Sequence, residues 1–314
     1  MNYELLIIPL AYILDLVFGD PQWHWHPVRL IGRLIERLEN KLNTGRMNKI
    51  FCGAVLVILV VGLTVFGIRG ILKLARLIHP FLFYILSTLF IYFSLSIRVL
   101  AAEAVKIYKN LESEDIQKAR DNLSMIVGRD TLELNEQEVI RATVETVAES
   151  TMDGIIAPLF YAFLGGPVMV WVYKAINTLD SMVGYRNERF KEFGYVSAKL
   201  DGLLNFIPSK ITCFLISISI FCCGKRWFCS LKEVGRYLLS GPGANSDAVE
   251  AAMAGGLGVQ LGGTNFYDSV AVEKPFIGQA AELLNIKHIR QSVMIAYVSS
   301  TLMLITGVIF FKGG

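Results

Sequence analysis

Long apolar blocks alternate with long polar segments along the 314 residues of this chain. A membrane-spanning helix needs about 20 mostly apolar residues, and the candidate blocks cover residues 3–18, 50–68, 81–97, 155–176, 206–223 and 292–311. Polar segments lie between them at residues 19–49, 98–154, 177–205 and 224–291. The alternation predicts an all-α, polytopic integral membrane protein with about five or six membrane-embedded segments. We expect one membrane-embedded domain over residues 1–314, in which 98–154 and 224–291 are polar cytosolic-side segments with amphipathic helices.

The block at 155–176 is interrupted by Gly165-Gly166-Pro167, a sequence that breaks or kinks a helix. If every block crossed the membrane, segment 177–205 would face the opposite side from the other polar segments. A site shared by these segments requires one block that does not fully cross. We therefore predict that 155–176 is kinked or re-entrant, because irregular backbone at membrane depth is tolerated where it lines a polar cavity.

Composition supports a membrane location and excludes some functions. Hydrophobic residues make up 54% of the chain and charged residues 18%, so charge is depleted relative to a soluble domain. The net charge of +3 and the lack of a basic arm argue against nucleic-acid binding. The five cysteines show no paired C-x-x-C spacing and are interpreted as reduced packing residues. Residues 5–18 follow no basic stretch and are expected to be a retained helix rather than a cleaved signal peptide.

The segment after the first block combines a turn with a basic stripe. Arg29, Arg33, Arg37 and Lys41 recur at helical spacing and predict an amphipathic helix lying against anionic lipid headgroups. The turn at 19–21 is flanked by Asp15, Asp20, His24, His26 and Arg29. Its histidines allow a zinc site, but no cysteine or further histidine completes one. A turn at the membrane interface, with two tryptophans at headgroup level, is the simpler interpretation.

A helix is predicted to start near Asn135, where Asn135 and Glu138 form a capping-box pattern. Its polar face carries Glu145, Glu149 and Asp153, and the chain becomes apolar immediately afterwards. Charged residues at a membrane boundary are costly and usually functional. Three carboxylates on one stripe are able to hold Mg²⁺, which binds through a few carboxylates and substrate phosphates. A solvated helix face is the alternative interpretation.

Two turns are candidates for anion binding. Arg129 and Asp130 precede the carboxylate helix, and Arg129 fits either a two-point contact with phosphate or a helix-capping ion pair. The glycine-rich turn at 240–247 contains Asn245 and leads into a helix of small residues. Such a turn binds phosphate through backbone N–H groups in some proteins. It does not match the P-loop pattern, and the small residues after it favour close helix packing.

A further polar face follows the block at 155–176. Lys174, Asn177, Asp180 and Ser181 share one side of a predicted helix that leads into the turn at 184–186. Polar residues directly after an apolar block are not needed there for solubility. We predict that this face lines a cavity, and a cap at the helix C-terminus is the alternative.

Several motifs resemble the CbiB/CobD family of cobalamin biosynthesis. They read DLVFGDP (15–21), HPVRLIG (26–32), ETVAESTMDGIIAPLFY (145–161), NTLDSMVGY (177–185) and AMAGGLGVQLGG (252–263). The resemblance covers nearly the whole chain. It implies a polytopic adenosylcobinamide-phosphate synthase in the cell membrane, with its active site on the cytoplasmic side. The implied reaction joins aminopropanol, or its O-phosphate, to the propionate carboxylate of adenosylcobyric acid while ATP is consumed.

The implied chemistry suggests a role for each candidate residue. A carboxylate must be activated by ATP before an amine attacks it, so the site needs Mg²⁺ ligands, cations around the phosphoryl group and little water. We expect Mg²⁺ at Glu145, Glu149 and Asp153. The expected phosphate ligands are Arg129, Arg186 and Lys210. The base toward the amine is expected to be Asp180 or Asp201. The expected substrate contacts are Asp20, His26, Arg29, Asp130, Asn177, Tyr185, Asn205 and Asn245.

Three positions depart from the family pattern, at Gly202, at Lys210 and in the turn 240–245. They leave open whether the amine is used free or phosphorylated. The main rivals are a corrinoid-binding membrane scaffold, a transporter or a regulatory membrane protein without catalysis, because polar residues at broken helices also mark transport sites. Association with other cobalamin-assembly enzymes and homo-oligomer formation stay open as well.

Overall fold

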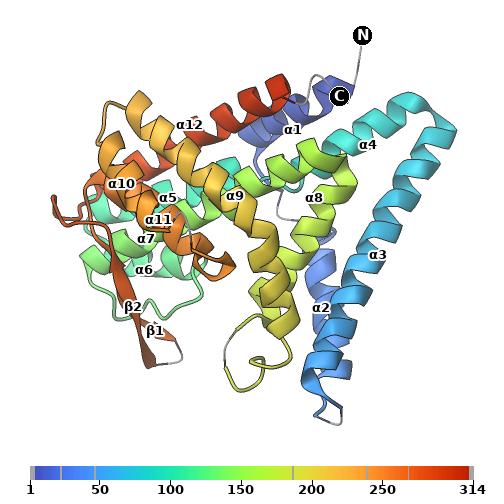
Figure 1. Ribbon diagram of the computed structural model, residues 1–314, viewed down its shortest axis with the longest axis horizontal. Helices are drawn as coiled ribbons and strands as arrows, with labels where there is room; N and C mark the ends of the chain where they lie inside the picture. Colours follow the sequence, from blue (N-terminus) through green and yellow to red (C-terminus); the bar gives the residue numbers. More distant parts are fainter. Residues whose placement is uncertain are drawn as a thin grey trace. The chain divides into compact units, whose positions relative to one another are not determined.

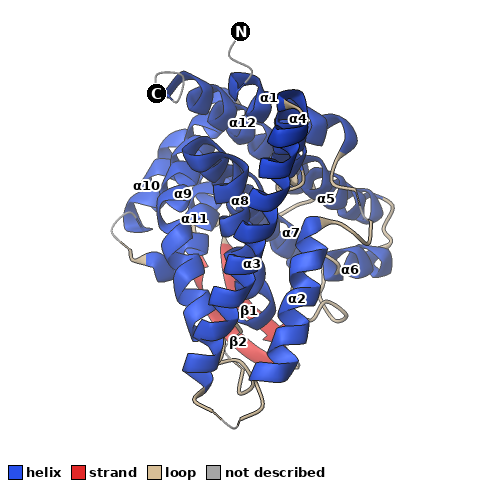
Figure 2. Ribbon diagram, turned by 90° about the vertical axis from the view of Figure 1, so that its right-hand side faces the viewer, coloured by secondary structure: helices blue, strands red, loops and turns tan. Residues whose placement is uncertain are grey.

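The computed structural model describes residues 4–21, 23–45, 47–185, 187–237, 240–267 and 269–310. Helices make up most of these described residues, and the strands found among them form one hairpin (Figures 1 and 2). Within the described residues, five helical stretches are long and apolar enough to cross a membrane: Lys49–Ile78, Pro80–Glu112, Glu136–Val183, Tyr195–Cys222 and Lys287–Phe310. A shorter apolar helix covers Leu6–Phe18. The helical, polytopic membrane class predicted from the sequence is confirmed.

The chain forms two compact units. Unit 1 consists of Met1–Ser96, Ala157–Phe206 and Leu304–Gly314, and unit 2 consists of Ile97–Ile156 and Ile207–Met303. Helices α9 (Tyr195–Cys222) and α12 (Lys287–Phe310) contribute residues to both units. The organisation as one membrane-embedded domain stays a prediction.

Unit 1 is built from α1 (Glu4–Phe18), α2 (Pro27–Leu42), α3 (Lys49–Ile78), α4 (Pro80–Tyr92), α8 (Ala157–Val183) and the first part of α9. Helix α3 packs along α2, α4 and α8 (Figure 1). Trp171 is fully buried in the core, and its indole Nε1 donates to the carbonyl of Phe90 at 2.9 Å. Large apolar side chains such as Phe66 remain exposed on α3. Their exposure fits a helix that faces lipid.

The basic amphipathic helix predicted after the first block is confirmed as α2. Ile31 and Ile35 are buried in the core of unit 1, and Arg29 lies on an exposed part of the helix surface. Pro27 occupies the first turn, where its missing N–H costs no hydrogen bond. Contact of the basic stripe with lipid headgroups stays a prediction.

The predicted break in the fourth apolar block is confirmed within α8. Gly165 (φ −158°, ψ 25°) and Gly166 (φ 63°, ψ −155°) leave helical geometry directly before Pro167. A positive φ of this kind is accessible to glycine at little cost, and proline cannot donate the next helical hydrogen bond. The sequence therefore kinks the helix in its middle. The prediction that this element does not fully cross the membrane stays a prediction.

Unit 2 contains α5 (Ile97–Glu112), α6 (Ile116–Ser124), α7 (Glu136–Thr151), the π-helical turn η1 (Met152–Ile156), α10 (Trp227–Tyr237), the 3₁₀ turn η2 (Pro242–Ala244) and α11 (Asn245–Leu257). Helices α10 and α11 pack closely, because Gly255 brings its backbone against the carbonyl of Cys229. A Cβ at Gly255 would lie 2.7 Å from that oxygen. The close packing expected from the small residues of α11 is confirmed.

An antiparallel hairpin of β1 (Leu261–Tyr267) and β2 (Val270–Ile277) follows α11 (Figure 2). Gly263 pairs with Lys274, and Asn265 pairs with Val272. The register shifts between Leu261 and Gly263, where Gly262 has a φ of +80°. The sequence analysis did not predict this hairpin.

Candidate functional site

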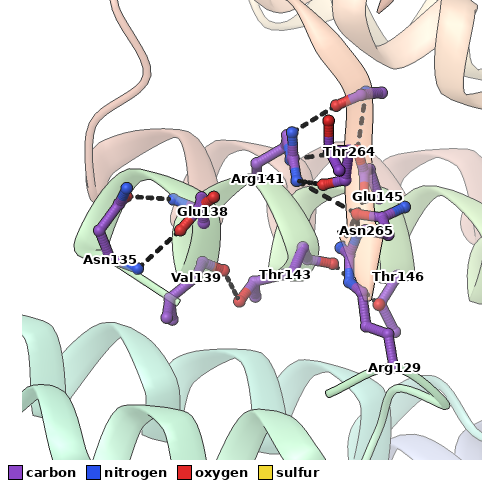
Figure 3. A network of polar contacts seen from close by, with 12 residues as sticks. Arg129, Asn135, Glu138, Val139, Arg141, Thr143, Glu145, Thr146, Thr264 and Asn265 are labelled. Carbon is purple, nitrogen blue, oxygen red and sulfur yellow. Dashed lines mark hydrogen bonds and ion pairs between the residues drawn. The ribbon is translucent and has the colours of Figure 1, made fainter. Parts of the chain in front are cut away.

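Helix α7 carries the polar face of unit 2. Its N-terminus is fixed by the predicted capping box: the Asn135 side chain accepts from the Glu138 N–H at 3.0 Å, and the Glu138 carboxylate accepts from the Asn135 N–H at 2.8 Å. The carboxylate of Glu138 is therefore used at the helix end, whereas Glu145 lies further along the helix (Figure 3). Glu149 follows one turn later in the sequence of the same helix. The local sequence thus sets which carboxylates are left for other roles.

Glu145 and Arg129 form a buried ion pair. The Arg129 Nη2 lies 2.6 Å from the Glu145 Oε2, and the side chains are only 7% and 9% exposed. The other carboxylate oxygen accepts from the backbone N–H of Gly262 at 2.8 Å. Both oxygens of Glu145 are therefore occupied by donors from the turn before α7 and from β1. Glu145 lies in the middle of α7, so this ion pair is not the helix-capping pair considered for Arg129, and the contact of Arg129 with phosphate stays a prediction.

Arg141 joins α7 to the hairpin. Its guanidinium donates to the carbonyl of Thr264 at 2.9 Å and to the side-chain oxygen of Asn265 at 3.1 Å (Figure 3). It also donates to the carbonyl of Gly262 at 2.5 Å. Arg129 also donates to the Asn265 oxygen. Two guanidinium groups thus share one amide oxygen, which fixes β1 against the polar face of α7.

A polar cavity of about 120 Å³ lies beside this network, within unit 2. Residues from the turn before α7, from α7, from α11 and from the hairpin line it: Ile126, Val127, Gly128, Arg129, Glu145, Thr146, Glu149, Glu250, Asn265, Tyr267 and Lys274. Arg129, Glu145 and Glu149 are predicted site residues that the fold brings together. Asp153 lies in the π-helical turn η1 and is not among the residues that line the cavity.

Glu250 is the most deeply buried carboxyl group of this cavity. It is 1% exposed, and no donor among the described residues reaches either of its oxygens. Burial, together with the negative charges of Glu149 and Glu145, holds its pKa well above the ordinary value. Burial alone would lower the pKa of Lys274, but the carboxylates of Glu250 and Glu149 outweigh it and raise that pKa. The cavity therefore combines carboxyl groups whose joint ionisation is disfavoured with a firmly protonated lysine.

The chemistry of the cavity suits a cation with phosphate ligands. No group of three or more histidine, cysteine, aspartate or glutamate side chains in the described part of the chain is arranged to hold a metal ion. Mg²⁺ is commonly bound through only one or two protein carboxylates, with waters and substrate phosphates as the other ligands. Glu149 and Glu250 offer such a pair, and Lys274 offers a cation for phosphate. The donors present fit Mg²⁺.

Asp130, a predicted substrate contact, holds the end of the hairpin. Its backbone N–H donates to the carbonyl of Phe266 at 2.8 Å, and its carboxylate accepts from the Ser269 N–H at 2.7 Å. These contacts hold Phe266, near the end of β1, and Ser269, just before β2, against the turn that precedes α7. A role of Asp130 in substrate binding stays a prediction.

A second polar cluster belongs to unit 1 and joins α8 to α9. Asp201 accepts from the side-chain amides of Asn177 at 3.3 Å and Asn205 at 3.0 Å. The Tyr173 hydroxyl donates to the Asn205 oxygen at 3.0 Å. Asp180 and Asp201 are close enough to repel each other electrostatically. The polar face predicted at 174–181 therefore faces polar side chains of α9, and Asp180, Asp201, Asn177 and Asn205 are brought together.

Other predicted residues lie elsewhere in the two units. In unit 1, His26 pairs with Asp20 at 2.7 Å, Arg29 is exposed on α2, and Tyr185 is 48% exposed. Arg186 lies outside the described residues.

Two further predicted site residues, Lys210 and Asn245, belong to unit 2. Lys210 donates to the carbonyl of Tyr237 at 2.9 Å, and the buried Asn245 accepts from the Ser209 hydroxyl at 3.1 Å. Asn245 thus ties the start of α11 to α9. Substrate contacts of these residues stay predictions.

The sequence analysis missed Glu250, Lys274, Asn265 and Tyr267 as cavity residues. Glu250 stands among the alanines and glycines of α11, and an acid within this small-residue stretch was its only signal. Lys274 and Asn265 lie on the hairpin that was not predicted. Their place in the cavity depends on pairing between α7, α11 and β1, which is not visible in local sequence.

Comparison with known proteins gives the family. The sequence profile of the CobD/Cbib protein family matches residues 8–296. The cobalamin biosynthesis protein CobD of Clostridium perfringens is 45% identical over 287 residues, which cover 90% of each chain. The cobalamin biosynthesis protein CbiB of Salmonella typhi is 41% identical over 299 residues, which cover 94% of this chain and 93% of the relative. No solved structure matches the chain. The protein belongs to the CobD/CbiB family of cobalamin biosynthesis proteins.

Proposed function

We propose that this protein is an ATP-dependent acid–amine ligase of the cell membrane. It joins aminopropanol, or its O-phosphate, to the propionate carboxylate of adenosylcobyric acid and forms adenosylcobinamide or its phosphate. The family and the five membrane-length helices support a membrane enzyme of cobalamin synthesis. The observation that carries the proposal is the cavity of unit 2, where Glu149, Glu250 and Lys274 gather in a buried polar site.

The reaction needs activation, because a carboxylate is a poor acylating agent. A propionate oxygen attacks the γ-phosphorus of ATP, and the bond to ADP breaks, which gives an acyl phosphate and ADP. The amine nitrogen then attacks the acyl carbon, the C–O bond to phosphate breaks, and the nitrogen loses a proton to a base. Bound Mg²⁺ supplies positive charge to the phosphate oxygens. The base is proposed to be Asp180 or Asp201.

The groups of the cavity support this chemistry by position and charge. Lys274 is held protonated by its carboxylate neighbours and presents a cation to phosphate oxygens. Glu145 and Glu149 are the two sequence-predicted Mg²⁺ ligands that line the cavity, and Glu145 is already held by Arg129. Arg129, whose guanidinium is neutralised by Glu145, fixes the wall of the cavity rather than offering a free charge. We propose that the ATP-handling side of the site faces the cytoplasm, where ATP is available.

The test is an assay of ADP release by the purified full-length protein in lipid nanodiscs. The reaction contains ATP, Mg²⁺ and adenosylcobyric acid, with either free or phosphorylated aminopropanol. We expect ADP release that requires both the corrinoid and one of the amines, together with formation of the amide product by mass spectrometry. Tight corrinoid binding without ADP release would support a scaffold and overturn the proposal.

A matched pair of variants locates the activity. Lys274→Met removes the cavity cation and is expected to lower ADP release at least tenfold, because a cation aimed at a transferred phosphoryl group stabilises developing charge. Lys106→Met removes an exposed lysine of α5 that pairs with Glu103 at 2.7 Å. It is expected to leave the rate unchanged. Equal rates for both variants would move the phosphoryl chemistry away from this cavity.

A further inference from the structure

Glu250 lies within α11 and lines the polar cavity of unit 2. It is 1% exposed, and neither of its carboxyl oxygens accepts a hydrogen bond from any residue that the structure describes. Buried carboxyl groups are normally hydrogen-bonded or paired with a cation. Among the described residues, only the carboxyl group of Glu149 lies near enough to share a proton with Glu250. A buried carboxyl pair that lines a polar cavity and has no other hydrogen-bond donor therefore indicates a bound cation.

Glu149 of α7 is the carboxylate that acts most strongly on Glu250. Two carboxylates this close cannot both be ionised unless a cation or a proton lies between them. Lys274 adds one positive charge, which leaves these three groups with a net charge of −1 when all are ionised. The pair therefore still lacks positive charge, while the neighbouring Glu145 is already neutralised by Arg129.

We propose that Glu149 and Glu250 together bind a divalent cation, with Mg²⁺ as the ion that the donors suit, and that Lys274 contacts the phosphate groups this ion carries. The inference rests on the proposed function and identifies Glu250 as the second carboxylate ligand. Glu145 is then a positioning residue, because both of its oxygens are held by Arg129 and by the N–H of Gly262.

The donor types and the available space favour Mg²⁺. No histidine or cysteine among the described residues lines the cavity, so the metal ligands that it offers are oxygen atoms, which a hard cation prefers. A volume of about 120 Å³ holds about four waters at liquid density. Mg²⁺ keeps several waters and exchanges some of them for phosphate oxygens. Its binding changes the net charge of Glu149, Glu250 and Lys274 from −1 to +1, so the cavity then attracts a polyphosphate.

The experiment measures binding of Mn²⁺, used as a Mg²⁺ probe whose electron paramagnetic resonance signal separates free from bound ion. The full-length protein in nanodiscs is titrated with MnCl₂, with and without the non-hydrolysable ATP analogue AMP-PNP. We expect about one bound ion per chain, with tighter binding when the analogue is present. Glu250→Gln and Glu149→Gln are each expected to weaken binding about tenfold or more, because each removes a charged ligand.

Controls separate metal binding from folding. Glu138→Gln removes a charge from the same helix while keeping the capping oxygen, and it should bind Mn²⁺ as the wild type does. Thermal unfolding in EDTA should show Glu250→Gln at least as stable as the wild type, because the amide removes repulsion from Glu149. If Glu250→Gln fails to fold, the Mn²⁺ affinity of Glu149→Gln tests the inference in its place. Mn²⁺ affinity within twofold of wild type in the folded Glu250→Gln or Glu149→Gln variant would overturn the inference.

The outcomes also separate this inference from the proposed function. Specific Mn²⁺ binding without ADP release would preserve the cation site and reject the ligase activity. Mg²⁺-dependent ADP release by a Glu250→Gln variant at the wild-type rate, with unchanged Mn²⁺ binding, would preserve the activity and reject the site. A carboxyl pair that shares a proton instead would show no bound Mn²⁺ in the wild type at any concentration of AMP-PNP, which also rejects the site.

Discussion

Arg129 and Glu145 are separated by 16 residues in sequence and form an ion pair of 2.6 Å that is almost completely buried. The second oxygen of Glu145 accepts from the N–H of Gly262. One carboxylate therefore fixes three segments of unit 2: the turn before α7, the helix itself and strand β1. The ion pair therefore holds the cavity wall together, and both oxygens of Glu145 are used in doing so.

Removing one partner of this ion pair should lower the free energy of unfolding. Glu145→Gln leaves the guanidinium of Arg129 buried without its counter-charge, and we expect a loss of about 3 kcal/mol of unfolding free energy. The double variant Arg129→Met/Glu145→Gln should lose less than the sum of the single variants, because the orphaned charge is then gone. Thermal and urea unfolding in detergent measure both. Strictly additive losses would show that the two side chains do not stabilise each other.

Close packing of α10 and α11 gives a prediction with its own control. Gly255→Ala places a methyl group 2.7 Å from the carbonyl oxygen of Cys229 and is expected to cost about 2 kcal/mol. Gly235→Ala on α10 meets no atom within 4 Å and should stabilise the protein by about 0.5 kcal/mol, since alanine loses less entropy in a helix. Thermal unfolding of the two variants should therefore shift in opposite directions. A Gly255→Ala variant as stable as the wild type would contradict the observed packing.

The helices could be predicted because their signals are local. The apolar blocks, the capping box at Asn135 and the Gly165-Gly166-Pro167 break each depend on neighbours within a few residues. The same local pattern placed Glu145 and Glu149 on one helix face. It also placed Asp153 there, but the π-helical turn at Met152–Ile156 changes the helical spacing after Thr151.

The hairpin and the second half of the cavity could not be predicted in this way. Strand β1 begins Leu-Gly-Gly, and Gly262 and Gly263 both adopt a positive φ, so the segment resembles a loop in sequence. Most of β2 is exposed and lacks the alternation that marks a half-buried strand. Lys274 enters the cavity only because β2 pairs with β1 and β1 is bound by Arg141. Such pairing is a long-range property.

Glu250 predicts a pH dependence of stability. Its pKa is raised in the folded state by burial and by the carboxylates of Glu149 and Glu145, with Lys274 as the opposing charge. Folding therefore favours the protonated form. This stabilising contribution is complete below the pKa of about 4.3 for an unfolded glutamate and is lost as the pH rises through the folded pKa. In EDTA, the stability of the wild type relative to Glu250→Gln should therefore fall as the pH rises from the unfolded pKa through the raised folded pKa of Glu250. Parallel curves for both proteins would contradict the raised pKa.

The polar cluster of unit 1 gives the last prediction. Asp201 is held by the amides of Asn177 and Asn205, and Asn205 is in turn held by the Tyr173 hydroxyl at 3.0 Å. Asp201→Asn puts an amide donor against amide donors and removes the proposed base, so we expect ADP release coupled to amide formation to fall about a hundredfold or more.

Tyr173→Phe tests the same cluster one contact further away. It removes the donor to the buried Asn205 oxygen and should cost about 1–2 kcal/mol of stability, with a much smaller loss of rate than Asp201→Asn. Tyr195→Phe, at an exposed tyrosine at the start of α9, is the control and should change neither quantity. If Asp201→Asn keeps the wild-type rate while Asp180→Asn loses it, the base is Asp180, and Asp201 only orients its neighbours. Wild-type rates for both aspartate variants would remove this cluster from the reaction.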